Sequence, residues 1–117
     1  MKDPPASEFC RLGDLWTRAG ELTPAENAFR KGLALEPYSY LCHRELGEID
    51  RAKGNLTPAR EHLEFVVRFY PEADARTYVS LALLYRAQGH PDLAREILRK
   101  GQRIFPKEPL LSRVSSR

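Results

Sequence analysis

Side chains that could carry chemistry gather in one short stretch, at Cys42, His43 and Asp50. Thiolate, imidazole and carboxylate groups bind metal ions and act as nucleophile or base, so this stretch is the first candidate for a reactive or metal-binding cluster. On a helix, however, the spacing between His43 and Asp50 corresponds to about 10 Å, and Cys42 points about 100° away from His43. The spacing therefore favours a structural role, in which Asp50 pairs with a nearby arginine and His43 is half-buried.

The rest of the chain contains no recognisable catalytic motif. The glycines are isolated, which excludes a phosphate-binding loop, and neither HExxH nor CxxC occurs. No nucleophile elbow surrounds a serine. We expect His62 to lie on the surface, His90 to start a helix, and Cys10 to fill a small space rather than serve as a modifiable thiol. The sequence thus predicts a protein that is not an enzyme, with no catalytic residue, metal or cofactor.

The composition is that of a small globular domain. Of the 117 residues, 42% are hydrophobic and 30% are charged, and this length suits one domain over 1–117. No apolar run approaches the ~20 residues of a membrane span, and no secretory signal is visible at the N-terminus. Two cysteines are too few for a disulfide scaffold or a four-ligand zinc site. We therefore expect a cytoplasmic domain without a membrane partner, or a piece of a longer protein.

Four sets of residues recur at the same spacing, 34 and then 35 residues. They are Pro37, Pro71 and Pro106; Gly20, Gly54 and Gly89; Ala25, Ala59 and Ala94; and Leu12, Leu46 and Leu81. Such a period indicates tandem copies of one supersecondary unit. We place the repeats at about 6–39, 40–74 and 75–108, and we interpret 109–117 as a short cap or tail.

Each repeat has the pattern of two helices joined by a turn. In the first repeat, apolar or small residues recur at i, i+3, i+4 and i+7 from Phe9 to Trp16, and a second such run begins at Ala25. Gly20 lies between the two runs, as is typical of a helix C-terminus. Asp3 can cap the first helix. The pattern predicts an all-α protein of three helix-turn-helix repeats.

A proline marks the start of each second helix. Thr23 and Pro24, with Glu26 behind them, match a capping box that has proline at the first helical position, and Thr57 repeats the cap. We therefore expect Thr23 and Thr57 to cap these helices. In the third repeat His90 directly precedes the proline, which predicts a start about two residues earlier and a tighter loop.

These residues resemble the tetratricopeptide repeat family. The first repeat reads Phe9-x2-Leu12-Gly13-x2-Trp16, then Ala25-x3-Phe29 and Pro37, and the third reads Tyr78-x2-Leu81-Ala82-x2-Tyr85, then Ala94-x3-Leu98 and Pro106. The second repeat departs from this pattern, because His43 and Asp50 stand where large aromatic residues are usual, and a weakened repeat is the alternative to their structural role. The resemblance implies a right-handed α-solenoid, with a short C-terminal capping segment here, whose first helices line a concave, ligand-binding face.

Helical geometry predicts which residues of the first helices face that groove. The candidate partner-binding residues are Arg11, Asp14, Arg18, Arg44, Glu45, Glu48, Arg51, Arg76, Ser80 and Arg86. This stripe is rich in arginine, whose planar group makes forked pairs with carboxylates, so we expect an acidic segment or a free C-terminal carboxylate as partner. The alternative is a surface of ordinary salt bridges that join Arg44 to Glu48, Glu48 to Arg51, and Arg11 to Asp14.

Some members of the family hold the carboxylate tail of a heat-shock chaperone with a set of lysine, asparagine and arginine residues. The resemblance places those positions at Cys10, Asp14, Glu45, Arg76 and Ser80. Of these, Arg76 is compatible with a carboxylate, whereas Asp14 and Glu45 would repel one. We therefore do not expect this clamp to operate here.

The C-terminal end and the basic residues provide two alternatives to a peptide-binding adaptor. Leu110 and Leu111 can cover the last repeat, against Ile97, Leu98 and Ile104. If apolar surface remains uncovered, the chain dimerises through this end and acts as an assembly or chaperone-like subunit. An RNA-associated module is the second alternative. It is disfavoured because basic and acidic residues alternate along the chain and the repeat-defining aromatic residues are expected to point into the core.

Overall fold

The computed structural model describes residues 6–115, and within that range it contains seven α-helices and no strand. Their bounds are α1 (Ala6–Arg18), α2 (Leu22–Leu35), α3 (Tyr40–Ala52), α4 (Leu56–Phe69), α5 (Ala75–Ala87), α6 (Pro91–Ile104) and α7 (Pro109–Ser115). The predicted all-α class is confirmed. The expected cap Asp3 lies outside the described residues.

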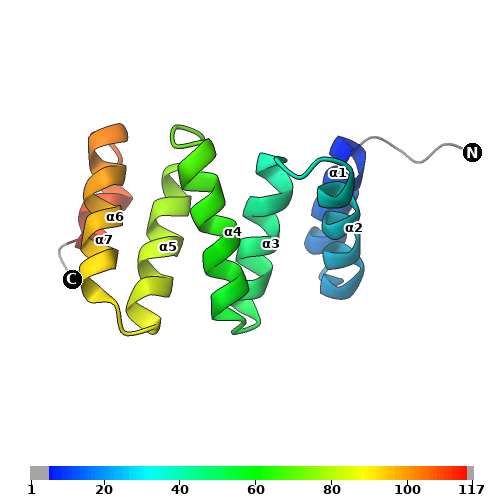
Figure 1. Cartoon of the computed structure of the whole chain (residues 1–117), viewed down its shortest axis with the longest axis horizontal. Coiled ribbons are helices and arrows are strands. Elements are labelled where there is room, and N and C mark those ends of the chain that lie inside the picture. Colours follow the sequence, from blue (N-terminus) through cyan, green and yellow to red (C-terminus); the bar gives the residue numbers. More distant parts are fainter. Residues whose placement is uncertain (1–5, 116–117) are drawn as a thin grey trace, which may run out of the picture.

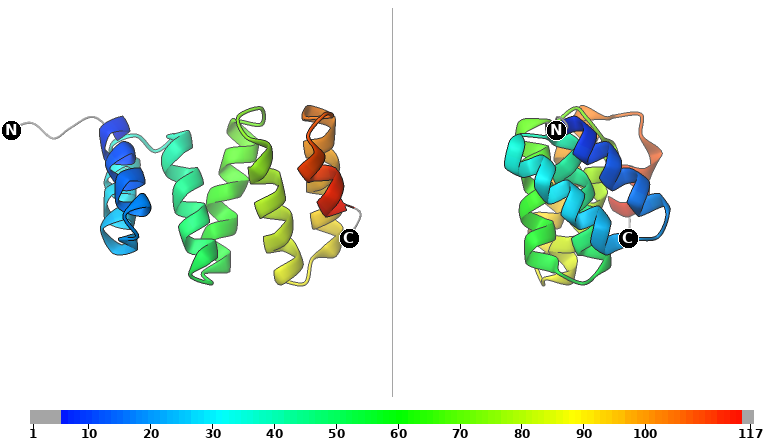
Figure 2. Two further views of the ribbon diagram at one scale, coloured as in Figure 1. Left: turned by 180° about the vertical axis from the view of Figure 1, so that it is seen from behind. Right: turned by 90° about the vertical axis from the view of Figure 1, so that its right-hand side faces the viewer.

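The helices form three hairpins stacked in a row, with α7 added at the end (Figure 1). Figure 1 looks onto α2, α4 and α6, whereas Figure 2, seen from behind, presents α1, α3, α5 and α7. The molecule therefore has two layers of helices along an extended body of 52 × 26 × 22 Å. This is the α-solenoid predicted from the repeat, since each hairpin buries its apolar side against the next one.

Each hairpin turns at a glycine with positive φ. Gly20, Gly54 and Gly89 have φ of 80°, 81° and 81°, a conformation that side chains with a Cβ rarely adopt. After Gly20, the amide of Glu21 donates to the carbonyl of Trp16 at 2.9 Å, and the same bond recurs after the other two glycines. This is a Schellman C-cap, which satisfies the last carbonyls of the first helix.

The second helices begin earlier than predicted. Each starts two residues after its turn glycine, so Thr23 and Thr57 lie inside helices α2 and α4 and are not their caps. The N-cap residues are Glu21 and Asn55, and neither makes a side-chain capping bond. His90 does occupy the N-cap position, as predicted, but its loop has the same length as the others. The glycine turn determines where the second helix starts, and the threonine-proline pair lies inside the first turn of that helix without capping it.

Two apolar clusters fill the space between the layers. The larger one spans α4 to α7 and includes Tyr78, Leu81, Leu98 and Leu111, and the smaller one, which we call the N-terminal cluster, joins α1, α2 and α3. Its members are Cys10, Ala25, Phe29, Cys42, Leu46 and Ile49. Close helix packing depends on small residues, because a Cβ on Gly13 would lie 2.5 Å from the ring of Phe29.

Two residues predicted to face the core lie largely at the surface. Leu12 is 42% exposed and Trp16 is 38% exposed. They belong to the first hairpin of the described stack, one side of which has no neighbouring hairpin (Figures 1 and 2). The corresponding residues of the third repeat, Leu81 and Tyr85, are buried as predicted.

Candidate functional site

A charged groove opens on the layer of first helices, between α3, α5 and α7. Its volume is about 410 Å³. It is lined by Arg44, Glu45, Glu48 and Arg51 from α3, Asp74, Arg76, Thr77, Val79, Ser80 and Leu83 at α5, and Leu110 from α7. Helical periodicity explains this lining, because residues three and four apart on α3 project from the same side of the helix.

The N-terminus of α5 contributes a residue with two roles. Asp74 is the N-cap of α5, and its Oδ1 accepts a hydrogen bond from the amide of Arg76 at 2.9 Å. Its other oxygen, Oδ2, accepts from Nη1 of Arg44 at 3.1 Å. The residue that caps the first helix of the third repeat therefore also holds a side chain of α3 in the second repeat, which makes the groove a feature of the stack and not of one hairpin.

The charges in the groove neutralise one another. Nη2 of Arg44 donates to Oε1 of Glu45 at 2.5 Å, in addition to its bond with Asp74. Burial lowers the pKa of Arg44, but the hydrogen bonds and charges of Glu45 and Tyr40 together outweigh this effect and leave the pKa above its ordinary value. Arg51 pairs with Glu48 at 3.0 Å. Three arginines thus face three carboxylates, and Arg76 is the one whose guanidinium has no ion-pair partner within residues 6–115.

Of the three salt bridges predicted from the sequence, one is present in the structure and two are replaced by other pairs. The Glu48–Arg51 pair is present, whereas Arg44 pairs with Glu45 and Asp74 instead of Glu48. Arg11 pairs with Glu8 at 3.9 Å and not with Asp14. Sequence spacing could not reveal the role of Asp74, because that contact depends on how two repeats are rotated against each other.

Six of the ten predicted groove residues come together in this cavity, namely Arg44, Glu45, Glu48, Arg51, Arg76 and Ser80. The other four lie elsewhere. Arg11 lines a separate cavity beside three tyrosines, and Asp14 pairs with Arg18 along α1 at 3.1 Å. Nη2 of Arg86 donates to the carbonyl of Val114 at 3.1 Å, which ties α7 to α5.

Sequence reasoning places Val79 and Leu83 on the groove-facing stripe of α5, but it missed three other residues of the groove, Asp74, Thr77 and Leu110. Asp74 precedes a helix and carries a recognisable capping signal. Leu110 was expected to pack on the last repeat, and it also reaches the groove. Thr77 is 2% exposed, and its Oγ1 has no hydrogen-bond partner in the part of the chain that the structure describes. No sequence signal distinguishes it.

The histidine and aspartate of the second repeat form a local network with a second histidine. His43 stacks on Phe65, and its Nε2 lies 2.7 Å from the carbonyl of Pro37. Because a carbonyl only accepts, Nε2 of His43 carries the proton, and Nδ1 of the neutral ring accepts from Nδ1 of His62 at 3.0 Å. Nε2 of His62 then faces Oδ2 of Asp50 at 4.0 Å.

This network corrects two expectations. Asp50 is 3% exposed and its side chain faces a histidine, not an arginine. His62 is partly buried and not a surface residue, whereas His43 is half-buried as predicted. Burial lowers the pKa of His43. Burial, together with the neighbouring His43, also lowers the pKa of His62. Burial therefore favours the neutral form of both rings.

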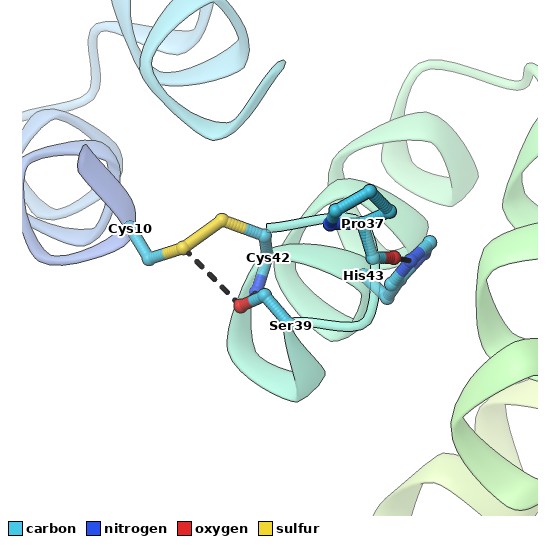
Figure 3. Close-up of a disulfide and its surroundings, with 5 residues drawn as sticks. All are labelled: Cys10, Pro37, Ser39, Cys42 and His43. Atoms are coloured by element: carbon cyan, nitrogen blue, oxygen red, sulfur yellow. Dashed lines mark hydrogen bonds between the residues drawn. A yellow bond between two sulfur atoms is a disulfide. The ribbon is translucent and has the colours of Figure 1, made fainter. Parts of the chain in front are cut away.

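The two cysteines are bonded to each other. Figure 3 shows the disulfide between Cys10 of α1 and Cys42 of α3, with Cα atoms 5.5 Å apart. Ser39, the N-cap of α3, accepts from the amide of Cys42 at 3.3 Å and lies 3.4 Å from Sγ of Cys10. Cys10 is buried in the N-terminal cluster, as expected of a residue that fills a small space, but its bond to Cys42 was not predicted from the sequence.

Among the described residues, no group of three or more histidine, cysteine, aspartate or glutamate side chains is placed to hold a metal ion. None of the described helices is both long enough and apolar enough to cross a membrane.

These features define the class: a stack of helical hairpins with a ligand-sized groove on the face of its first helices. Residues 75–108 match the family model described as tetratricopeptide repeat. The search of curated proteins finds no match to the sequence. The family match therefore shows a tetratricopeptide repeat at residues 75–108, in agreement with the resemblance, and the solved structures below share the fold of the whole stack.

Solved structures share this fold at low sequence identity. MamA superposes with a TM-score of 0.85 at 21% identity over 94% of this chain and 64% of its own. PilF of Pseudomonas aeruginosa superposes with a TM-score of 0.84 at 20% identity, over 95% of this chain and 50% of PilF. The first TPR domain of Spaghetti (RPAP3), bound to the HSP90 peptide SRMEEVD, superposes with a TM-score of 0.81 at 14% identity. The match covers 95% of this chain and 90% of that domain. The chain therefore spans between half and two thirds of the length of MamA and PilF.

Proposed function

We propose that the chain is a non-catalytic interaction module, or adaptor, that binds an extended peptide in the groove between α3 and α5. The observation that carries the proposal is the lining itself, which combines charged side chains of α3 and the start of α5 with the apolar residues Val79, Leu83 and Leu110. Such a surface offers hydrogen bonds to a peptide backbone and a contact for one of its side chains. The likeness in fold to a domain bound to an HSP90 peptide supports the same conclusion.

The charge pairing refines the partner expected from the sequence. Since Arg44 and Arg51 are already held by carboxylates, the groove does not act as a broadly basic surface. Arg76 is exposed and has a free guanidinium among the described residues, so it is the group that would fix one carboxylate. We therefore propose a peptide with one carboxylate, terminal or from a side chain, at Arg76 and an aliphatic side chain on Leu83.

The alternatives receive less support. Self-association through the C-terminal end would need exposed apolar surface there, yet α7 already buries Leu111 and Val114. An RNA-associated role would need rings on which bases stack, and no aromatic side chain lines the groove within the described residues. The proposal assigns no catalytic residue, cofactor or metal to the chain.

The predicted cytoplasmic location and the disulfide favour different compartments. Disulfides persist in secreted and periplasmic proteins, whereas the thiols of cytosolic proteins are kept reduced. The bond between Cys10 and Cys42 therefore supports an oxidising compartment. Alkylation of thiols in intact cells, followed by mass spectrometry, separates the two proposals, because alkylated cysteines support the cytoplasm.

Affinity capture with groove variants tests the binding proposal. We expect Arg76→Glu combined with Leu83→Glu to lose the partner that the unmodified domain captures, since both side chains are exposed groove residues. Arg30→Glu with Leu35→Glu on α2 is the matched control, with the same substitutions at exposed positions of the other layer. Capture that survives in the groove variant, or fails equally in the control, would overturn the proposal.

A further inference from the structure

The outer surface of α6 carries a second cavity, distinct from the groove in position and in charge. Its volume is about 440 Å³. It is lined by Tyr85 of α5 and by Leu93, Glu96, Ile97, Arg99, Lys100 and Arg103 of α6. Helix α6 belongs to the layer of α2 and α4, on the side away from α3 and α7 (Figures 1 and 2). No residue is shared with the lining of the groove.

The cations of this cavity are not neutralised. Arg99, Lys100 and Arg103 make no ion pair or hydrogen bond with any described side chain, whereas Arg95 on the same helix is paired with Asp92. Glu96 is the one acidic residue in the lining, so three positive charges face one negative charge. The groove, with its three arginines and three carboxylates, has no such excess. An excess of unpaired positive charge attracts a negatively charged partner.

The base of the cavity is apolar and fixed in place. Ile97 and the ring of Tyr85 are buried, and Leu93 is half-buried. The hydroxyl of Tyr85 donates to Oε2 of Glu64 at 2.6 Å, and the guanidinium of Arg60 lies over the ring at 5.0 Å. Held from two sides, the Tyr85 ring cannot rotate away, and it offers one apolar contact beneath the cations.

We propose that this cavity, which we call the α6 site, binds an acidic segment of a partner protein. Carboxylates of the segment pair with Arg99, Lys100 and Arg103, and one aliphatic side chain rests on the Tyr85–Ile97 base. Arg99 and Arg103 are one helical turn apart, about 6 Å along the axis, which matches the spacing of carboxylates two residues apart in an extended chain.

The chemistry of the α6 site favours a protein segment over RNA or a membrane. The ring of Tyr85 is buried and braced, so no base can stack on its face. Insertion into a bilayer needs protruding apolar side chains, and those of this lining are buried or half-buried. What remains accessible is three charged groups above a shallow apolar contact, which suits carboxylates with one apolar neighbour.

Fluorescence anisotropy tests the proposal. The probe is a short labelled peptide of glutamates and aspartates around a single leucine, titrated with the full chain at low salt. We expect Arg99→Glu/Lys100→Glu/Arg103→Glu to weaken binding by about tenfold or more, the sum of three modest ion pairs. Leu93→Ser, which leaves the charges intact, should weaken binding about threefold by removing part of the apolar base.

A charge-matched variant distinguishes binding at the α6 site from a general attraction of the peptide to the net charge of the protein. Arg11→Glu/Arg30→Glu/Arg68→Glu changes the net charge by the same amount at exposed positions outside the α6 site. We expect it to retain binding within about twofold. An equal loss in the two triple variants would overturn the proposal. So would tighter, α6-dependent binding of a labelled RNA oligonucleotide or of phosphatidylserine vesicles, because either result assigns the site to another ligand.

Discussion

Removal of the Cys10–Cys42 disulfide should destabilise the protein strongly and unevenly. The bond spans a sequence separation of 32 residues. In the chain-entropy model, closing a loop of this length lowers the entropy of the unfolded state enough to stabilise the fold by roughly 3.7 kcal/mol. Domains of this kind have unfolding free energies of about 5–15 kcal/mol in total, so the expected loss is a large share.

The position of the bond predicts where the loss is felt. Cys10 and Cys42 lie in the N-terminal cluster, which packs α1, α2 and α3 around Phe29 and Leu46. The larger cluster, from α4 to α7, does not include them. Hydrogen exchange followed by mass spectrometry should therefore show faster exchange in α1 and α2 without the bond, and nearly unchanged exchange in α5 and α6.

A double-mutant cycle identifies the bond as the cause. Either Cys10→Ala or Cys42→Ala alone removes the whole cross-link, so urea unfolding should find the double variant about as unstable as each single variant. A reductant should destabilise the unmodified protein and leave the double variant unchanged. If the two single losses instead add up in the double variant, the cysteines act as independent buried thiols and the reasoning is refuted.

Three further predictions concern the second repeat. His43→Phe should lower the free energy of unfolding by about 1–3 kcal/mol, because the carbonyl of Pro37 and the ring N–H of His62 lose their partner; a raised melting temperature would show that the hydrogen bonds contribute nothing. Burial lowers the pKa of both histidines in the folded protein, so as the pH falls the unfolded chain binds protons before the folded one does. The urea concentration at the midpoint of unfolding should therefore fall as the pH drops below about 6.5 and be steady above it. A midpoint independent of pH between 7.5 and 5.5 would contradict this. Gly47→Ala should cost about 1–3 kcal/mol in thermal unfolding despite the better helix propensity of alanine, since the added Cβ would lie 2.6 Å from Cδ2 of Leu63; a stabilised variant would show that α3 and α4 can separate freely.

The sequence was sufficient to predict the architecture because the repeat constrains it at several levels at once. The spacing of Gly20, Gly54 and Gly89 marks the turns, and their positive φ explains why glycine recurs there. The helix starts were misplaced because a threonine-proline pair was read as a cap. In the structure the glycine turn determines the start, and Thr23 follows inside the helix.

Contacts between helices were harder to predict than the helices themselves. The position of Arg44 in the groove follows from the period of α3, but its bond to Asp74 depends on the rotation of one repeat against the next. His62 was overlooked for the same reason, since it reaches His43 and Asp50 from α4. Pattern reasoning places residues on a face of one helix and does not place two helices face to face.

The disulfide could have been inferred from spacing. Cys10 and Cys42 are 32 residues apart, close to the repeat period of 34, so they occupy nearly equivalent positions on adjacent first helices. In a stacked array such positions are neighbours. Counting two cysteines as too few for a scaffold ignored the fact that a single bond can join two repeats.

Salt should affect the groove and the α6 site differently, because the charges of the groove are largely paired with one another and those of the α6 site are not. In the groove, Arg44 and Arg51 are paired with partly buried carboxylates, so a ligand there meets a fixed surface without net charge. At the α6 site, Arg99 and Arg103 are exposed and unpaired among the described residues, so they act at a distance and are screened by salt. A partner that uses both surfaces should therefore associate more slowly as salt rises while keeping its groove contacts, and its rate of dissociation should change little.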